Sequence, residues 1–296
     1  MIAIQGERPH FLPNESAGLT ETPDPPLRYP ADSESGEGEP APSEPLDVTP
    51  YETTSYVTAL PPELPPRPSR RTLVFVIDDA GHNMHQLEPF LAFPGRLTIA
   101  VLPGLPYSAE AARRAREAGM EVILHQPMEA VGMEDPGPGA IYSWMDEEEI
   151  LEILRRNLEE IGPVAGMNNH QGSRITADAR IMEIVLGFSK YAGIPFLDSL
   201  TTASSTASAV ARRMGMTIAT RDVFLDNDPD RASISRAIAE GRRVASRTGN
   251  AVMIGHVWSP ELAPLLNELY QYLAEQGYEF ATASQLIAEL ARRADG

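Results

Sequence analysis

Short apolar runs alternate with amphipathic helical stretches from residue 72 to the end of the chain. Alternation of this kind is typical of parallel β-α-β units joined by right-handed crossovers. Seven or eight such units predict an α/β fold, either a barrel or a doubly wound sheet. No Gly-x-Gly-x-x-Gly or Gly-Lys-Ser/Thr motif follows any of the runs. We therefore favour the barrel and expect no nucleotide cofactor. The expected strands are 72–77, 97–102, 121–124, 164–168, 194–197, 216–220 and 251–254, with a short eighth piece at 278–281.

The first of these strands organises the chain. Its apolar residues 73–77 run without a polar break, as in a strand buried on both faces, and they end on Asp78 and Asp79. Parallel α/β folds place their chemistry beyond the carboxyl ends of the strands. Neighbouring side chains on an extended strand point in opposite directions, so one carboxylate can hold a metal while the other acts as a base. The pair is equally consistent with a strand cap followed by a turn at Gly81.

Composition divides the chain near residue 68. Residues 1–68 contain 15 of the 27 prolines and 12 Asp or Glu against three Arg, which is half of the formal net charge of −18. Such a segment buries too little apolar surface to offset the entropy of ordering. We expect a disordered, acidic, Pro-rich linker at 1–68 and one domain at 69–296.

The overall charge and the absence of cysteine limit the ligands. The chain is acidic and shows no basic stripe, so we expect no nucleic-acid partner. Without cysteine, any metal must be held by His and carboxylate ligands. We find no signal peptide and no run of about 20 apolar residues. The opening Met-Ile-Ala-Ile and the linker fit the stub of a missing membrane anchor, or equally a cytoplasmic protein with an N-terminal tail.

Three of the six histidines follow expected strands, namely His125, His170 and His256, and Asp198 ends a further strand. In the expected barrel, the carboxyl ends of these strands surround one opening, the mouth of the barrel. One carboxylate and two imidazoles suit a divalent cation such as zinc, with positions left open for water. Such an ion lowers the pKa of its bound water and polarises a carbonyl group. A second carboxylate then suits the general base, and a separate His the general acid.

Other polar and aromatic residues near these strand ends are candidates for supporting roles. Glu129 follows His125 by four residues, and we expect it to orient that imidazole. Arg174 is open to three interpretations: a partner for an aspartate, a contact for a substrate oxygen, or an ordinary residue at a helix start. Trp258 offers a stacking face for a sugar ring, whereas Trp144 is better interpreted as a core or loop residue.

Five motifs occur in the order Ile-Asp-Asp-Ala-Gly (77–81), Leu-His-Gln-Pro-Met-Glu (124–129), Asn-Asn-His-Gln-Gly-Ser-Arg (168–174), Phe-Leu-Asp-Ser (196–199) and Ile-Gly-His (254–256). Together they resemble the divergent polysaccharide deacetylase family, a distant branch of the NodB-type carbohydrate esterases, over about residues 70–292. The resemblance implies a distorted seven-stranded (β/α) barrel. It also implies metal-dependent removal of an acetyl group from a cell-envelope glycan. Members of this group are generally exported or anchored, which implies the periplasm or cell envelope.

The resemblance also implies individual roles. It makes Asp78 the base, Asp79 a metal ligand and His256 the acid. The better-known branch takes both metal imidazoles from one His-x-x-x-His motif, whereas here Glu129 stands at the second position. We therefore expect His170 to join His125 as the second imidazole ligand.

Two other functions remain open from the sequence. One is a catalytically inactive barrel that binds an envelope glycan or a protein partner. The other is a different metal-dependent hydrolase, such as a phosphoesterase. The few basic residues near the expected mouth, Arg174 and Arg221, argue against phosphoryl chemistry.

Overall fold

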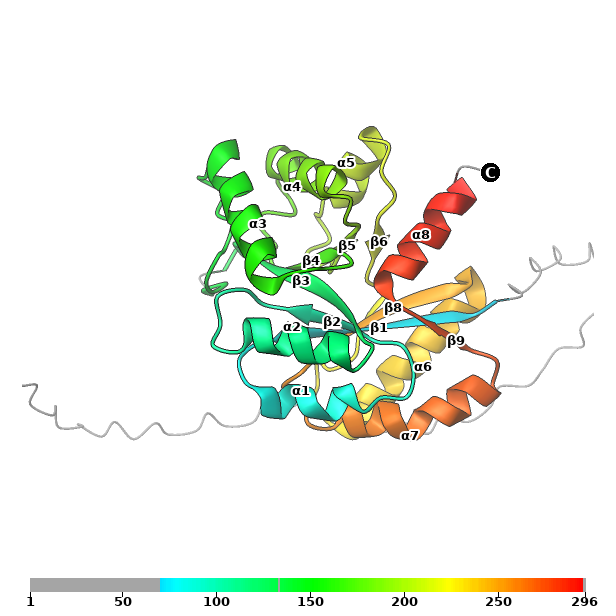
Figure 1. Cartoon of the computed structure of the whole chain (residues 1–296). Coiled ribbons are helices and arrows are strands. Elements are labelled where there is room, and N and C mark those ends of the chain that lie inside the picture. The colour runs from blue at the N-terminus through cyan, green and yellow to red at the C-terminus, as the bar shows by residue number, and fades with distance from the viewer. Residues whose placement is uncertain (1–69, 133, 295–296) are drawn as a thin grey trace, which may run out of the picture. The chain divides into compact units, whose positions relative to one another are not determined.

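The computed structural model describes residues 70–132 and 134–294, and the expected linker at 1–68 lies outside them. The described part forms one curled, parallel sheet with helices packed around it (Figure 1). The strands are β1 (Thr72–Ala80), β2 (Thr98–Val101), β3 (Glu121–Met128), β4 (Met167–Gln171), β5 (Phe196–Asp198), β6 (Ala219–Thr220), β7 (Val223–Phe224), β8 (Asn250–His256) and β9 (Glu279–Ala281).

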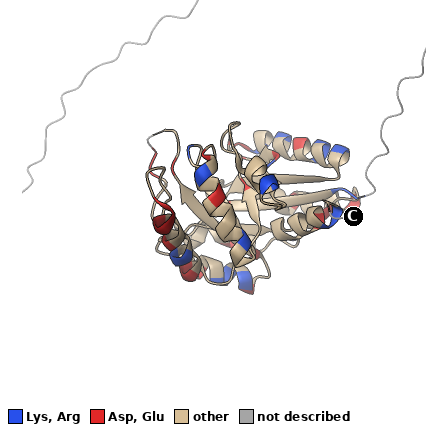
Figure 2. Ribbon diagram, turned by 90° about the horizontal axis from the view of Figure 1, so that it is seen from above, with Lys and Arg blue, Asp and Glu red and all other residues tan. Residues whose placement is uncertain are grey.

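Asn or Asp side chains cap the first turn of four helices in the described residues, among them α3 (Glu147–Ile161). Asp146 and Glu149 form a reciprocal capping box at the start of α3, in which each carboxylate accepts the other residue's backbone N–H at 2.9–3.0 Å. The first turn of this helix contains three glutamates, whose negative charges lie at the positive end of the helix dipole. The acidic residues of this helix stand out in red at the left of Figure 2. In the described residues, no helix is long and apolar enough to cross a membrane. The helices are α1 (Met84–Leu91), α2 (Ser108–Glu117), α3 (Glu147–Ile161), α4 (Ala179–Ala192), α5 (Ala207–Arg213), α6 (Arg231–Thr248), α7 (Leu262–Glu275) and α8 (Ala283–Ala294).

The two ends of the curled sheet are joined in sequence by two residues. Its strand order is β6-β5-β4-β3-β2-β1-β8-β7, with β9 paired to β1, and all pairs are parallel. The first and last strands of this path are separated in sequence only by Arg221 and Asp222. The Arg221 guanidinium donates to the carbonyls of Ser199 and Leu200 beyond β5, at 2.8 Å each. Asp222 exchanges two hydrogen bonds with Val252 of β8. The barrel-like architecture is therefore confirmed, with nine strand segments where seven or eight were expected.

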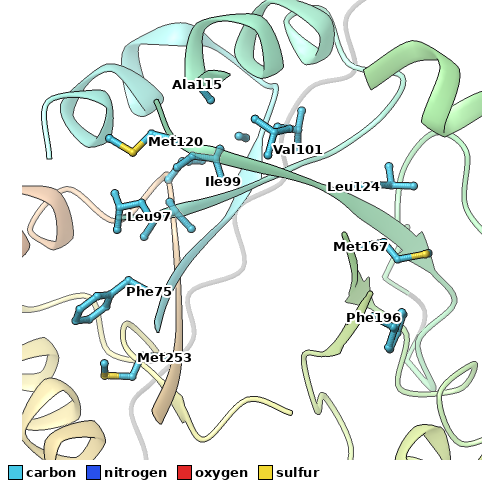
Figure 3. Packing of buried hydrophobic residues seen from close by; sticks show 14 of the residues in the cluster. Phe75, Leu97, Ile99, Val101, Ala115, Met120, Leu124, Met167, Phe196 and Met253 are labelled. Carbon is cyan, nitrogen blue, oxygen red and sulfur yellow. The ribbon is translucent and has the colours of Figure 1, made fainter. Parts of the chain in front are cut away.

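Side-chain alternation along the strands separates two apolar layers. On β1, the outward-facing residues Leu73, Phe75 and Ile77 belong to the apolar layer between the sheet and the surrounding helices. Figure 3 shows Phe75 in this layer. Val74 and Val76 point into the barrel and pack against inward-facing residues of the other strands. Helix α8 contributes Leu286 and Ile287 to this inner layer. Its first residues bond to the starting ends of β2 and β3, so it covers the end of the barrel opposite the carboxyl ends of the strands.

We predict that α8 is an integral part of the fold. Ile287 is 5% exposed within the inner layer, and Ile287→Ala should lower the free energy of unfolding by about 2–5 kcal/mol. Arg292→Ala, at an exposed position of the same helix, is the matched control and should change little. Urea unfolding monitored by circular dichroism measures both. Equal stability of the two variants would show that α8 does not close the barrel.

Candidate metal centre and active site

The inward-facing positions of three strands change from apolar to ionisable at the mouth. In each of β1, β3 and β8, a buried Val or Ile is followed two residues later by Asp78, His125 or His256. Because the period of a strand is two, these side chains extend the inner face of the barrel. With His170 of β4 they line a cavity of about 200 Å³. The structure thus brings together four of the residues that the sequence indicated.

Asp79 reaches the same mouth because β1 contains an extra residue. Against β2, Ile77 pairs with Ile99 but Ala80 pairs with Val101, so three residues of β1 span two of its partner. This irregularity is a β-bulge. Asp79 has φ +67°, a left-handed conformation that is uncommon for a residue other than glycine. On a regular strand its carboxylate would point away from Asp78, as the sequence suggested, and the bulge turns it back into the mouth.

Three donor atoms converge in this mouth. Asp79 Oδ1 lies 3.0 Å from His170 Nδ1 and 3.3 Å from His125 Nε2, and the two nitrogens are 3.2 Å apart. Burial alone would raise the pKa of Asp79, but the two imidazoles hold it well below its usual range. Within the described residues, Asp79 Oδ1 is buried and has no hydrogen-bond partner. A carboxylate and two imidazoles so arranged fit a divalent cation, and a metal site here is possible.

Asn168, which the sequence analysis did not single out, orients the metal-facing imidazole. Its Oδ1 lies 2.7 Å from His125 Nδ1, and its Nδ2 donates to Asp78 Oδ1 at 3.0 Å. The amide must place its oxygen toward the imidazole, because its NH₂ group faces the carboxylate. His125 therefore carries its proton on Nδ1 and presents the Nε2 lone pair to the centre. The sequence could have indicated Asn168, because it lies two residues before His170 and the two side chains therefore share one face of β4.

Glu129 does not have the role expected from its spacing. Helical neighbours lie four residues apart, but in a strand four residues span about 13 Å, too far for contact with His125. Glu129 instead pairs with Arg174, Oε1 to Nε at 2.9 Å, and accepts the Ser143 N–H at 2.7 Å. The prediction that it orients His125 is therefore wrong. Arg174 pairs with this glutamate, which the three earlier interpretations did not include.

Asp78 is held between the three candidate donor residues and His256. It is 2% exposed, and burial raises its pKa, although the nearby imidazoles of His125 and His256 oppose that effect. Its Oδ2 lies 3.5 Å from His125 Nε2. Because Asn168 occupies Oδ1, the second oxygen of this carboxylate is the one available to a ligand. The geometry suits a general base.

His256 is fixed by Asp226, a carboxylate that the sequence did not single out. Asp226 Oδ1 lies 2.9 Å from His256 Nδ1, and Oδ2 accepts the His256 backbone N–H at 2.8 Å. Burial would lower the pKa of His256, but this hydrogen bond and the charge of Asp78 raise it to about 8. With Nδ1 engaged, Nε2 is the nitrogen left for a ligand. The sequence could have indicated Asp226, because the apolar run 223–225 ends on this carboxylate as the apolar run of β1 ends on Asp78.

Trp258 connects the two halves of the site. Its indole stacks on the His256 ring with centroids 4.7 Å apart, and its Nε1 donates to Asp79 Oδ2 at 3.0 Å. The side chain is still 44% exposed. It can therefore order the site and offer a ring face to a ligand.

Asp198 is not brought into the cavity. Leu197 points into the barrel, so the next residue along β5 points outward. There Asp198 accepts the Leu200 N–H and the Ser205 hydroxyl, at 2.8 and 2.7 Å, and shapes the loop beyond the strand. Ser199, the following residue, faces the cavity instead and contacts Asn168. His82 and His85 are exposed.

Similar proteins were found in both sequence and structure. YibQ of Escherichia coli K12 is 32% identical over 184 residues, which is 62% of this chain and 58% of that protein. A protein of Haemophilus influenzae is 28% identical over 184 residues, 62% of this chain and 66% of its own length. This chain therefore covers less than two thirds of both relatives. The crystal structure of ATU2773 from Agrobacterium tumefaciens C58 has the same fold, with a TM-score of 0.69 at 23% identity over 74% of this chain and 90% of that one.

A family model supplies the assignment. The model described as divergent polysaccharide deacetylase matches residues 75–287, which include every strand from β1 to β9 apart from the first residues of β1. All the mouth residues described above lie inside the match. The chain belongs to the divergent polysaccharide deacetylase family.

Proposed function

We propose that the barrel is a divalent-metal-dependent hydrolase that removes an acetyl group from a glycan of the cell envelope, with zinc as the metal. One observation carries this proposal. A buried carboxylate, Asp78, stands between a cluster of three convergent metal donors and an imidazole held by a second carboxylate. Acyl hydrolysis needs this combination: a base for water, an electrophilic centre for the carbonyl, and an acid for the leaving group.

Asp79, His125 and His170 are the residues that would hold the metal. The bound cation would supply Lewis-acid polarisation of the acyl carbonyl and of water. Trp258 and Asn168 keep two of these ligands in place, through Asp79 Oδ2 and His125 Nδ1 respectively. The chain's contribution is thus an ordered set of donor atoms on side chains that are mostly buried.

Asp78 and His256 would move the protons. Asp78 Oδ2 accepts a proton from the attacking water, whose oxygen bonds to the acyl carbon. His256 Nε2 donates a proton to the departing sugar nitrogen or oxygen as the carbon–heteroatom bond breaks, and acetate is the second product. Asp226 keeps the imidazole in the orientation and the protonation state that this role requires.

The cavity admits only a small group. At about 200 Å³ it is smaller than pockets that enclose whole drug-sized ligands. We infer that the acetyl substituent enters while the sugar ring stays at the rim, against the exposed face of Trp258. The envelope location rests on the family resemblance and on the long acidic segment that precedes the domain.

Metal content tests the ligand set. Purified protein should contain about one divalent ion per chain by elemental analysis. Asp79→Ala and His170→Ala should lose it, because each removes one of three donors. His85→Ala, at an exposed histidine, is the control and should retain it. Retention in both donor variants, or no uptake of zinc, cobalt or nickel by the parent protein, would contradict the metal centre.

Turnover tests the base. Asp78→Asn should lower kcat on an acetylated glycan by about 10²–10⁴-fold, because the amide cannot accept the proton, while the metal content stays unchanged. Asp228→Asn, at an exposed loop carboxylate, should leave kcat as in the parent. Unchanged kcat in Asp78→Asn would remove this residue from catalysis. A parent protein that binds acetylated glycans but releases no acetate would instead identify an inactive binding barrel.

The pH profile tests the acid. His256 must be protonated to act, and its raised pKa is about 8, so kcat/KM should fall as pH rises through that value. Asp226→Asn removes the charge and acceptor that raise this pKa, and should shift the alkaline limb to lower pH by about one unit or more. An alkaline limb at the same pH in parent and variant would exclude His256 as its source.

A further inference from the structure

The loop between β3 and α3 carries an aromatic pair on the rim of the mouth. Tyr142 and Trp144 stack with ring centroids 6.0 Å apart and planes 13° apart, and Trp144 is 70% exposed. The sequence favoured a core or loop position for Trp144, and the structure places it on the loop. The chain has only two tryptophans. Trp258 stands at the metal centre and Trp144 beyond the carboxyl end of β3, so both belong to the same end of the barrel.

Hydrogen bonds fix this loop on both sides of the exposed indole. Ile141 extends the β3 ladder through two backbone bonds, to Pro127 and Glu129. On the other side of Trp144, the Met145 N–H closes a turn onto the Tyr142 carbonyl at 3.1 Å. The Arg180 guanidinium donates to the carbonyls of Ser143 and Met145. A large aromatic face is therefore exposed on a rigid support, and a ligand that stacks on it orders little of the chain.

Glu129 links the aromatic loop to a cation. Its Oε2 accepts the N–H of Ser143, the residue next to Trp144, and its Oε1 pairs with Arg174 Nε. Arg174 also donates to the Val131 carbonyl and is 44% exposed. The ring face is thus accompanied by a guanidinium and a carboxylate. An apolar face beside paired donors and acceptors matches a sugar, which presents C–H groups on its face and hydroxyl or amide groups at its edge.

This surface lies too far from the cavity to serve the reacting sugar. Glu129 is four strand residues, about 13 Å, beyond His125. In the proposed function, the reacting sugar ring stacks on Trp258, beside Asp79. A second ring on Trp144 must therefore belong to another unit of the same glycan chain.

We propose that Trp144, Tyr142, Arg174 and Glu129 form a remote subsite for a sugar ring, so that the ligand is an extended N-acetylhexosamine polymer rather than a mono- or disaccharide. The ligand class rests on the proposed function, whereas binding at the subsite does not require turnover. Glu129 is a positioning residue here: it joins the aromatic loop to Arg174, in the place where the better-known branch has a metal-binding histidine.

Calorimetric titration of the full chain with N-acetylglucosamine oligomers tests the subsite. The Asp78→Asn background prevents consumption of the ligand. In it, Trp144→Ala should weaken binding of the hexamer about tenfold, which is ~1.4 kcal/mol, and lower the ratio of hexamer to dimer affinity. Tyr191→Ala removes a 93% exposed aromatic ring from α4 and should leave that ratio unchanged.

A second variant separates positioning from metal binding. Glu129→Gln should weaken hexamer binding with unchanged metal content, because Glu129 supports the loop and does not ligate the ion. Loss of metal in Glu129→Gln would instead make this residue part of the metal centre and overturn its assigned role. Thermal unfolding of each variant shows whether the fold is retained.

The outcomes distinguish the subsite from the proposed hydrolysis. Hexamer affinity that is equal to that of the dimer, absent, or insensitive to Trp144→Ala overturns the subsite, even if the parent releases acetate. A Trp144-dependent preference for the hexamer without any acetate release supports the subsite and contradicts the hydrolysis alone.

Discussion

A single extra residue in β1 decides where the two carboxylates of the mouth lie. A regular strand directs adjacent side chains to opposite faces, yet Asp78 and Asp79 both point into the barrel. The left-handed backbone at Asp79 costs on the order of 1–3 kcal/mol. β1 can sustain that cost because it is buried inside the sheet and paired with β2, β8 and β9. The positions of Asp78 and Asp79, the proposed base and one proposed metal donor, therefore depend on the packing of one strand.

The mouth is one connected network rather than a set of separate residues. Asn168 joins Asp78 to His125, and Trp258 joins Asp79 to the His256 ring. Because each connecting side chain contacts two of the mouth residues, the orientation of the proposed metal donors and that of the proposed acid and base are set together. Gln171, the last residue of β4, and Leu200, two residues after β5, are also left-handed, so backbone strain accompanies the site there too.

The sequence predicted the strands and the residues that end them, because buried apolar runs and the polar residues after them are local signals. Asp78, Asp79, His125, His170 and His256 emerged as candidates for that reason, whereas the choice of Asp79, His125 and His170 as the donor set came from the family resemblance. The supporting residues were harder to predict. Asn168 and Asp226 act through contacts across strands, and Glu129 was misassigned because a four-residue spacing brings side chains together in a helix but not in a strand. No pattern in the sequence of β1 predicts the bulge at Asp79.

The join at Arg221 and Asp222 has a consequence for how the protein behaves among other chains. An open parallel sheet exposes a row of unpaired backbone groups at each border, and such borders recruit strands from neighbouring molecules. Here the two borders are strands of only two residues, β6 and β7, tied together by a charged dipeptide whose side chains satisfy nearby backbone groups. Within the described residues, the curled sheet thus keeps an open mouth for a ligand while the path of strands from β6 to β7 ends on two very short strands, which offer little template for pairing with another chain.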